Sequence, residues 1–215
     1  MTLSSGPAEK PHPAPARGPF RQLSAAARAA SLAAARAAGP ASEDFWVFGY
    51  ASLMWNPCFE HLEQREATLE GYARRFCVWT ALARGTPERP GLALGLEAGG
   101  PGCQGIAFRL RPSSLDVGLS MLWEREMVTG IYKPCWVDLS GAAGPLRALA
   151  FVADPTHQQY AGALPVEKTA AIIAAATGKF GSCSAYLEQT VSALTEARCP
   201  DRELTRLLAA VRLLV

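Results

Sequence analysis

The sequence has few histidines and no closely spaced cysteines, so it offers little material for a metal centre. Three of its 215 residues are histidine, and its six cysteines lie 16 to 48 residues apart. None of these cysteine spacings has the C-x-x-C form of a zinc site. We therefore expect no bound metal, and free thiols of the kind that persist in a reducing, cytoplasmic compartment.

Long hydrophobic runs are also missing. No stretch of 18 residues lacks a charged side chain, whereas a membrane-spanning helix needs roughly that length of apolar chain. The Ala-rich segment 24–38 contains Arg28 and Arg36 and lacks the unbroken apolar core of a secretory signal. We expect no membrane segment. The N-terminus suits either an organelle transit peptide or a plain tail followed by a helix.

An excess of charge of one sign is absent from most of the chain. The formal net charge is +2; residues 1–44 carry five basic and three acidic side chains, and the other 171 residues carry 16 of each. Affinity for nucleic acid depends largely on clustered lysine and arginine. This balance argues against a nucleic-acid partner.

Composition divides the chain near residue 44. Segment 1–19 holds five prolines among small residues, a composition that cannot build a core. Residues 22–38 are Ala-rich and end at Gly39-Pro40, which predicts a helix. We expect residues 1–44 to be a disordered Pro/Ala-rich tail plus this leading helix, and residues 45–215 to form one folded domain.

The order of the expected elements predicts an α+β fold. Short apolar runs bounded by glycine and proline predict strands over 46–50, 65–69, 72–83, 91–97, 102–110, 131–139 and 146–152. Helical periodicity predicts helices over 113–126, with Ser113 as N-cap, and over 165–176, 183–197 and 201–214. Strands followed by helices, with glycines at the strand bends, indicate a small mixed β-barrel with flanking helices and a helical C-terminal third.

One candidate functional segment is the turn after the first strand, segment 48–55 (FGYASLMW). Backbone N–H groups left free at such a turn can hold an anion such as a carboxylate, and Ser52 could add a hydroxyl donor. An ordinary strand-end turn would give the same pattern.

A second candidate is Glu126, at the end of the helix that follows the fifth strand. Leu119, Leu122 and Glu126 stand at i, i+3 and i+7, which places the glutamate on the apolar stripe. A carboxylate there is desolvated and its pKa is raised, which suits a general base. Glu124 points about 200° away and is expected in solvent. The alternative is that Glu126 simply pairs with Arg125 or another arginine.

Two further segments are less specific. The polar segment 84–91 (RGTPERPG) fits either a solvated connection or a substrate lid. Cys58 and His61 are a conceivable Cys–His nucleophile, but such pairs are usually distant in sequence. A buried or incidental thiol explains Cys58 equally well.

Five segments carry a family resemblance when they are taken in order. They are WVFGYASLMWNP (46–57), RGTPERPG (84–91), GIAFRL (105–110), RE followed by TGIY (125–132), and AFVAD followed by YAG (150–162). In order and spacing they resemble the ChaC branch of the γ-glutamylcyclotransferases. The resemblance covers about four fifths of the chain, from Trp46 to the C-terminus; each motif is weak alone, and the five together are specific.

The resemblance implies a glutathione-specific γ-glutamylcyclotransferase that releases 5-oxo-L-proline and cysteinylglycine without a metal or cofactor. It implies the fold of that family, a small mixed barrel with flanking helices, and it places the catalytic glutamate, the general acid/base, at Glu126. The family's Gly-Tyr-Gly-Ser-Leu loop falls on segment 49–53. The implied γ-glutamyl-binding residues there are Tyr50, Ala51, Ser52 and Leu53.

Other candidates concern the rest of the substrate. Arg84 could meet the glycine carboxylate of glutathione, since an arginine matches a carboxylate bidentately. Tyr132 and Tyr160, like Tyr50, are candidate hydroxyl donors. The family's second loop glycine is Ala51 here, which is strained if the position needs a positive φ and harmless if it does not.

Three alternatives stay open. The protein could be a cyclotransferase for other γ-glutamyl amino acids or amines, or a catalytically impaired γ-glutamyl-binding homologue if Ala51 distorts the loop. A glycosidase using Glu124 and Glu126 is disfavoured, because such a pair must converge on one bond. The sequence leaves the oligomeric state open.

Overall fold

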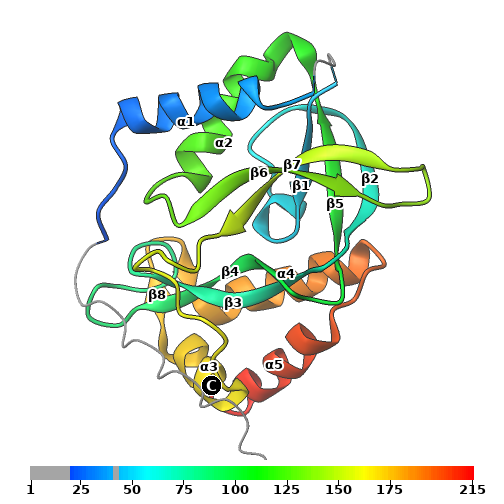
Figure 1. Ribbon diagram of the computed structural model, residues 1–215. Helices are drawn as coiled ribbons and strands as arrows, with labels where there is room; N and C mark the ends of the chain where they lie inside the picture. The colour runs from blue at the N-terminus through cyan, green and yellow to red at the C-terminus, as the bar shows by residue number, and fades with distance from the viewer. Residues whose placement is uncertain (1–19, 41–43) are drawn as a thin grey trace, which may run out of the picture.

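A seven-stranded mixed sheet lies at the centre of the computed structural model, which describes residues 20–40 and 44–215 (Figure 1). The tail expected over residues 1–19 lies outside the described residues. Each expected strand is present, with its ends displaced by at most four residues. The strands are β1 (Trp46–Gly49), β2 (His61–Leu69), β3 (Tyr72–Thr80), β4 (Gly91–Ala98), β5 (Cys103–Leu110), β6 (Tyr132–Leu139) and β7 (Leu146–Ala153).

Strand β7 changes its neighbour partway along its length. The strand order is β2-β5-β1-β7-β4-β3, and β6 pairs antiparallel with β7 along the full length of both strands. On its other side β7 pairs in parallel first with β1, where Val47 faces Leu149, and then with β4, where Leu96 faces Val152. This change of partner is a fork in the sheet, and the candidate site lies beside it.

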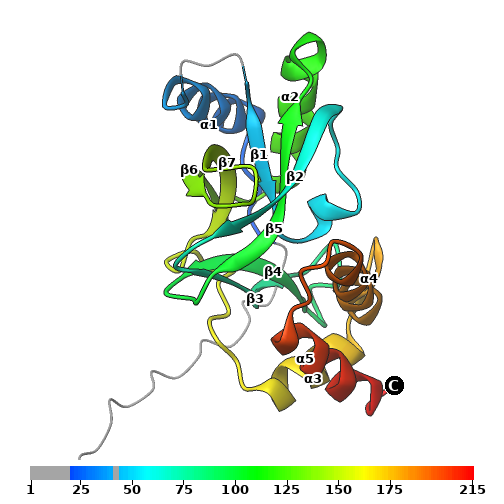
Figure 2. The ribbon, with the colours of Figure 1, turned by 90° about the vertical axis from the view of Figure 1, so that its right-hand side faces the viewer.

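The expectation of a barrel is wrong, since the sheet stays open with β2 and β3 at its two ends. The sheet stays open because of the fork. At the fork the antiparallel hairpin of β3 and β4 diverges from the other strands, and it packs against the C-terminal helices instead of pairing with β2 (Figure 2). An isolated bridge between Thr68 of β2 and Ser140 joins β2 to the end of β6. Among the described residues, β2 and the end of β6 pair only through this bridge, so the sheet does not close into a barrel.

The helices form two groups at opposite ends of the molecule (Figures 1 and 2). At one end α1 (Ala25–Ala37) contacts α2 (Leu115–Glu126). At the other end three helices gather beside β4, namely α3 (Val166–Ala175), α4 (Cys183–Glu196) and α5 (Arg202–Arg212). Short elements complete the fold: the 3₁₀ helices η1 (Ser52–Met54) and η2 (Pro112–Ser114), and a hairpin of β8 (Thr177–Gly178) and β9 (Gly181–Ser182).

Side-chain caps begin three of the helices. Ser24, Ser182 and Asp201 accept hydrogen bonds from the first turns of α1, α4 and α5. Such a cap stabilises a helix by about 1 kcal/mol. Ser113 does not cap α2 as expected, because it lies inside η2; Ser114 takes the N-cap position and makes no side-chain cap bond.

The buried face of α2 fixes the direction of its last residue. Leu119, Leu122 and Trp123 are at most 2% exposed and pack in one cluster with side chains of β1, β5 and β7. Each such side chain favours the folded state by about 1.5–3 kcal/mol relative to exposure. Because these residues set the rotation of α2, they also direct Glu126 toward the sheet. No helix among the described residues is long and apolar enough to cross a membrane.

Candidate active site

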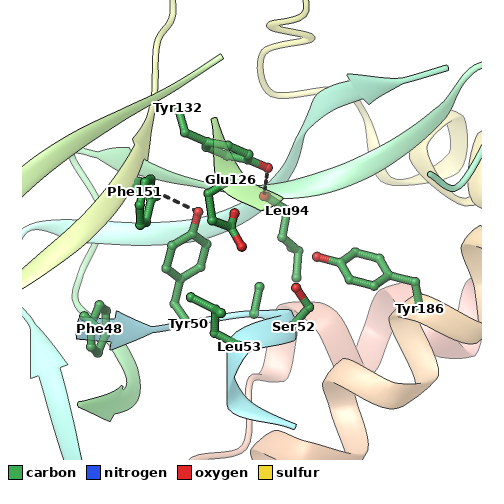
Figure 3. Close-up of a pocket in the computed structure, with 10 residues that line it drawn as sticks. Phe48, Tyr50, Ser52, Leu53, Leu94, Glu126, Tyr132, Phe151 and Tyr186 are labelled. Carbon is green, nitrogen blue, oxygen red and sulfur yellow. Dashed lines mark hydrogen bonds between the residues drawn. The ribbon is translucent and has the colours of Figure 1, made fainter. Parts of the chain in front are cut away.

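A small cavity lies at the fork, between β1, β4, β7 and the end of α2 (Figure 3). Its volume is about 30 Å³, enough for one or two water molecules. The lining residues are Phe48, Tyr50, Ala51, Ser52, Leu53, Leu94, Glu126, Tyr132, Phe151 and Tyr186. The structure thus brings together six of the residues predicted from the sequence: Tyr50, Ala51, Ser52, Leu53, Glu126 and Tyr132.

Glu126 directs its carboxylate into this cavity (Figure 3). Its side chain is only 16% exposed. Burial raises the pKa of this carboxyl, and the neighbouring Arg125 guanidinium partly opposes the rise. The last turn of a helix also disfavours negative charge, because the backbone carbonyls point that way. Such a carboxyl accepts and returns a proton more readily than a solvated one.

Arg125 connects Glu126 to the loop after β1. Its Nε lies 3.3 Å from Oε1 of Glu126, while Nη2 donates to Oγ of Ser52 at 2.5 Å and Nη1 donates to the Asn56 carbonyl at 2.5 Å. Glu126 is therefore ion-paired with Arg125, as the alternative interpretation expected, and it also faces the cavity. Glu124 is exposed, as expected from its position on the helix.

Three tyrosine hydroxyls lie around the carboxylate. Tyr50 donates to the Phe151 carbonyl at 2.9 Å, and Tyr132 donates to the Leu94 carbonyl at 2.7 Å. Tyr186, from α4, reaches the cavity from the side opposite Tyr50 (Figure 3). Burial raises the pKa of all three phenols. All three therefore stay protonated, and Tyr50 and Tyr132 act as hydrogen-bond donors.

Of the four lining residues that the sequence did not reveal, Tyr186 is the one with a polar side chain. It belongs to the buried stripe of α4 with Cys183, Leu187 and Thr190, which reads as an ordinary core face. The one available signal is chemical, because a buried tyrosine hydroxyl usually needs a polar partner. Nothing in the sequence shows that this end of α4 borders the fork.

The loop after β1 presents backbone N–H groups without partners. Met54 N–H donates to the Ala51 carbonyl and starts η1. The N–H groups of Ala51, Ser52 and Leu53 have no acceptor within residues 20–40 and 44–215. Successive N–H groups of this kind can form a concavity that holds an anion. In the alternative interpretation, an ordinary strand-end turn, these N–H groups would bind no anion.

The backbone of Ala51 does not occupy the left-handed region. Its φ is −140° and its ψ is −130°, so the position does not require the left-handed region that favours glycine. The alanine therefore needs no positive φ, and it adds a methyl group to the cavity wall.

Arg84 and Tyr160 do not line the cavity. The Nη1 of Arg84 donates to the Phe180 carbonyl at 2.6 Å, and its guanidinium lies 5.3 Å from the ring centre of Tyr186. Arg84 therefore contacts the cavity wall from behind. Tyr160 donates to Glu97, and its backbone is bridged to the edge strand β3, so its hydroxyl is engaged outside the cavity.

The two ends of segment 84–91 are held by close backbone packing, while Thr86, Glu88 and Arg89 between them are exposed, as in a solvated connection. A Cβ on Gly85 would lie 2.2 Å from the backbone nitrogen of Gly91, and one on Gly178 would lie 2.5 Å from that of Gly85. Only glycine permits such an approach. The ends of the segment are thereby fixed against the β8–β9 hairpin.

Cys58 and His61 do not form a catalytic pair. The His61 ring packs against Phe108 with 5.1 Å between ring centres, and Cys58 lies beside Arg125. Burial raises the pKa of the Cys58 thiol, the opposite of what a nucleophile needs. Among the residues that the structure describes, no group of three or more His, Cys, Asp or Glu side chains could hold a metal ion.

Comparison with known proteins gives a consistent family. Residues 45–214 match the family described as ChaC-like protein. An Escherichia coli protein named glutathione-specific γ-glutamylcyclotransferase is 40% identical over 193 residues, which cover 89% of this chain and 83% of the relative. A Rattus norvegicus protein named glutathione-specific γ-glutamylcyclotransferase 1 is 36% identical over 166 residues, covering 73% and 75% of the two chains.

The fold also has a counterpart among solved structures. A crystal structure of a γ-glutamyl cyclotransferase specific to glutathione from yeast matches with a TM-score of 0.72. The match covers 80% of this chain and 96% of that chain at 22% sequence identity. At that identity the likeness shows a shared fold and no more.

Proposed function

The chain belongs to the family of ChaC-like proteins, and on this basis we propose that it is a γ-glutamylcyclotransferase acting on glutathione. The products are 5-oxo-L-proline and L-cysteinylglycine. The observation that carries the proposal is the buried carboxylate of Glu126, which faces a cavity at the position where the family resemblance puts the catalytic glutamate. The cavity residues all follow residue 45, so we assign the activity to residues 45–215.

In this reaction the substrate carries its own nucleophile. The α-amine of the γ-glutamyl residue attacks the γ-carbonyl carbon, a new N–C bond closes a five-membered lactam, and the C–N bond to cysteine breaks. Holding the chain in the folded geometry supplies proximity, which in well-oriented cases corresponds to an effective molarity of about 10⁵–10⁸ M. The residues around the fork would impose that geometry.

The proton balance requires a group that both accepts and donates. The α-ammonium begins with three protons, the lactam nitrogen keeps one, and the departing amine gains two. No proton is released overall. Glu126 is the proposed carrier, since it can take each proton from the attacking nitrogen and return it to the leaving nitrogen; a positioned base of this kind contributes about 10²–10⁴-fold.

The loop N–H groups and the tyrosines would bind the rest of the reacting group. The N–H groups of Ala51, Ser52 and Leu53 offer donors to an anion, either the α-carboxylate or the oxyanion that develops on the γ-carbonyl. Tyr50 and Tyr132 would supply hydroxyl donors. A γ-glutamyl group needs more room than about 30 Å³, so substrate binding must widen this cavity.

Arg84 is the proposed partner of the glycine carboxylate. It stands behind Tyr186, beside the cavity, and its guanidinium has the planar geometry that matches a carboxylate. Tyr160 has no proposed contact with the substrate in this arrangement, because its hydroxyl is engaged by Glu97.

The proposal is tested by incubating the purified protein with glutathione and quantifying 5-oxoproline and cysteinylglycine by mass spectrometry. Equal amounts of the two products are expected. A parallel incubation with γ-glutamylalanine measures the specificity; faster release of 5-oxoproline from that dipeptide would identify a cyclotransferase for other γ-glutamyl compounds. Binding of glutathione without any product would identify an impaired homologue.

The Ala51→Gly variant is expected to keep the activity of the wild type and to be slightly less stable. The negative φ of Ala51 means that glycine relieves no left-handed strain, while it increases the freedom of the unfolded chain. The free energy of unfolding should fall by about 0.4–1 kcal/mol, as measured by urea denaturation. A large gain in turnover would show instead that the alanine methyl group obstructs the site.

A further inference from the structure

Arg74, on β3, is a buried arginine near the site, although it does not line the cavity. The residue is 5% exposed. Its Nη1 donates to the Tyr50 carbonyl, its Nη2 donates to the Gln104 carbonyl, and its Nε lies 3.2 Å from Oδ2 of Asp201. A buried arginine is costly unless its donors are satisfied, and here every nitrogen of the guanidinium has a partner.

The guanidinium sits where the pairing of β1 and β5 stops. On that side of the sheet the last pair is Gly49 with Ile106. The carbonyls that Arg74 binds lie just beyond this pair. Tyr50 directly follows Gly49, and Gln104 is separated from Ile106 by one residue, Gly105. Arg74 therefore replaces the strand-to-strand hydrogen bonds at this point and holds the loop that leaves β1.

Fixing the Tyr50 carbonyl also fixes the direction of the next N–H group. A trans peptide is planar, so its C=O and N–H point in opposite directions. With the Tyr50 carbonyl directed at Arg74, the N–H of Ala51 points away from Arg74, and Ala51 lines the cavity. This N–H is one of the three in the loop that have no acceptor within the described residues.

The same guanidinium ties the loop to the C-terminal helices. Asp201 is the N-cap of α5, where its Oδ1 accepts from the N–H groups of Glu203 and Leu204, while its Oδ2 faces Arg74. The start of α5 and the start of the substrate loop are thus joined through one charge pair, of which the arginine is buried and the aspartate partly exposed.

We propose that Arg74 is a positioning residue that holds the Tyr50–Ala51 peptide so that the Ala51 N–H binds the α-carboxylate of the γ-glutamyl group. This inference rests on the proposed function. It commits the loop to the α-carboxylate, one of the two anions that the loop could hold. Lysine in place of Arg74 keeps the positive charge beside Asp201 but offers a single nitrogen, which cannot hold both carbonyls.

The test compares two substrates in each enzyme. One is glutathione, and the other is a glutathione analogue whose γ-glutamyl α-carboxylate is a carboxamide. In the Arg74→Lys variant, kcat/KM for glutathione should fall by about 10–100-fold, the loss expected when a hydrogen bond to a charged group is misaligned. For the carboxamide analogue it should fall by less than about 3-fold, because the interaction with the anion is already missing.

A merely structural role would give a different pattern. Equal losses for the two substrates, or no loss for glutathione, would overturn the inference. Arg75→Lys is the matched control, since Arg75 is the neighbouring arginine on β3, its side chain is 42% exposed, and its ion-pair partner is Glu97. It should leave both rates unchanged.

If circular dichroism shows that Arg74→Lys is not folded, a second variant tests the inference. Asp201→Asn keeps an N-cap residue for α5 but removes the charge that orients Arg74. A loss of about 3–10-fold confined to glutathione is expected, and equal losses or none would overturn the inference. If the wild type itself yields no product from glutathione, the proposed function fails and the inference falls with it.

Discussion

The Glu126→Gln variant is expected to lose turnover of glutathione by about 10²–10⁴-fold and to remain folded. Glutamine has the size and hydrogen-bonding capacity of the glutamate but cannot carry a proton between the two nitrogens. The initial rate of 5-oxoproline release measures the loss, and circular dichroism verifies the fold. Full activity in this variant would remove Glu126 from the mechanism.

The same variant should also be more stable at neutral pH. The pKa of Glu126 is raised in the folded protein, so the folded state binds the proton more tightly than the unfolded state does. The free energy of unfolding therefore falls as the pH rises through the interval between the unfolded and folded pKa values, and the ionised carboxylate destabilises the fold above it. Glutamine removes this cost, so the melting temperature at pH 7 should rise.

Glu124→Gln is the matched control for both measurements. Glu124 lies on the same helix and is exposed to solvent. Its substitution should change neither the turnover nor the melting temperature appreciably. A similar loss of turnover in this control would mean that the charge of the α2 C-terminus, rather than the group in the cavity, is what the reaction needs.

The Arg125→Gln variant is expected to lose about 10-fold or more in kcat/KM at pH 7 and to recover part of it in alkali. Removal of the guanidinium lets the pKa of Glu126 rise further, so the acidic limb of the pH profile moves to higher pH. Ser52 and the Asn56 carbonyl also lose a charged donor, which loosens the loop and accounts for the part that alkali does not restore.

The pH profile of kcat/KM between pH 5 and pH 10 measures this shift. Arg111→Gln is the control, because Arg111 pairs at the surface with Glu60, both side chains being well exposed, and exposed pairs contribute little. Its profile should overlay that of the wild type. A profile of Arg125→Gln that drops uniformly at every pH would show that Arg125 only holds the loop and does not tune the base.

The position of Glu126 could be predicted because it depends on local periodicity. Leu119 and Leu122 place the glutamate on the buried face of α2, and the structure has both leucines fully buried and the carboxylate in the cavity. Six predicted residues meet there because the loop after β1 and the end of α2 are adjacent to β7. The approximate boundaries of the strands and helices could be predicted for the same reason, since turns and caps are also local signals in the sequence.

What could not be predicted is the fork in the sheet. It depends on the pairing of Val47 with Leu149 and of Leu96 with Val152, contacts between residues far apart in the sequence. Without the fork the strands suggest a closed barrel, and the apolar stripe of α4 gives no reason to assign Tyr186 to a site. The place of Arg84 behind Tyr186 could not be predicted for a related reason, because the packing of Gly85 against Gly91 and Gly178 sets where its side chain starts.

Intramolecular aminolysis assisted by Glu126 is tested most directly by running the reaction in water enriched in ¹⁸O. Cyclisation by the substrate's own amine incorporates no oxygen from water, so 5-oxoproline should carry no label and should appear in an amount equal to that of cysteinylglycine. With Glu126→Gln both products should form about 10²–10⁴-fold more slowly. Release of glutamate with one ¹⁸O in a carboxylate would show that water, not the amine, attacks the γ-carbonyl, and would contradict the account.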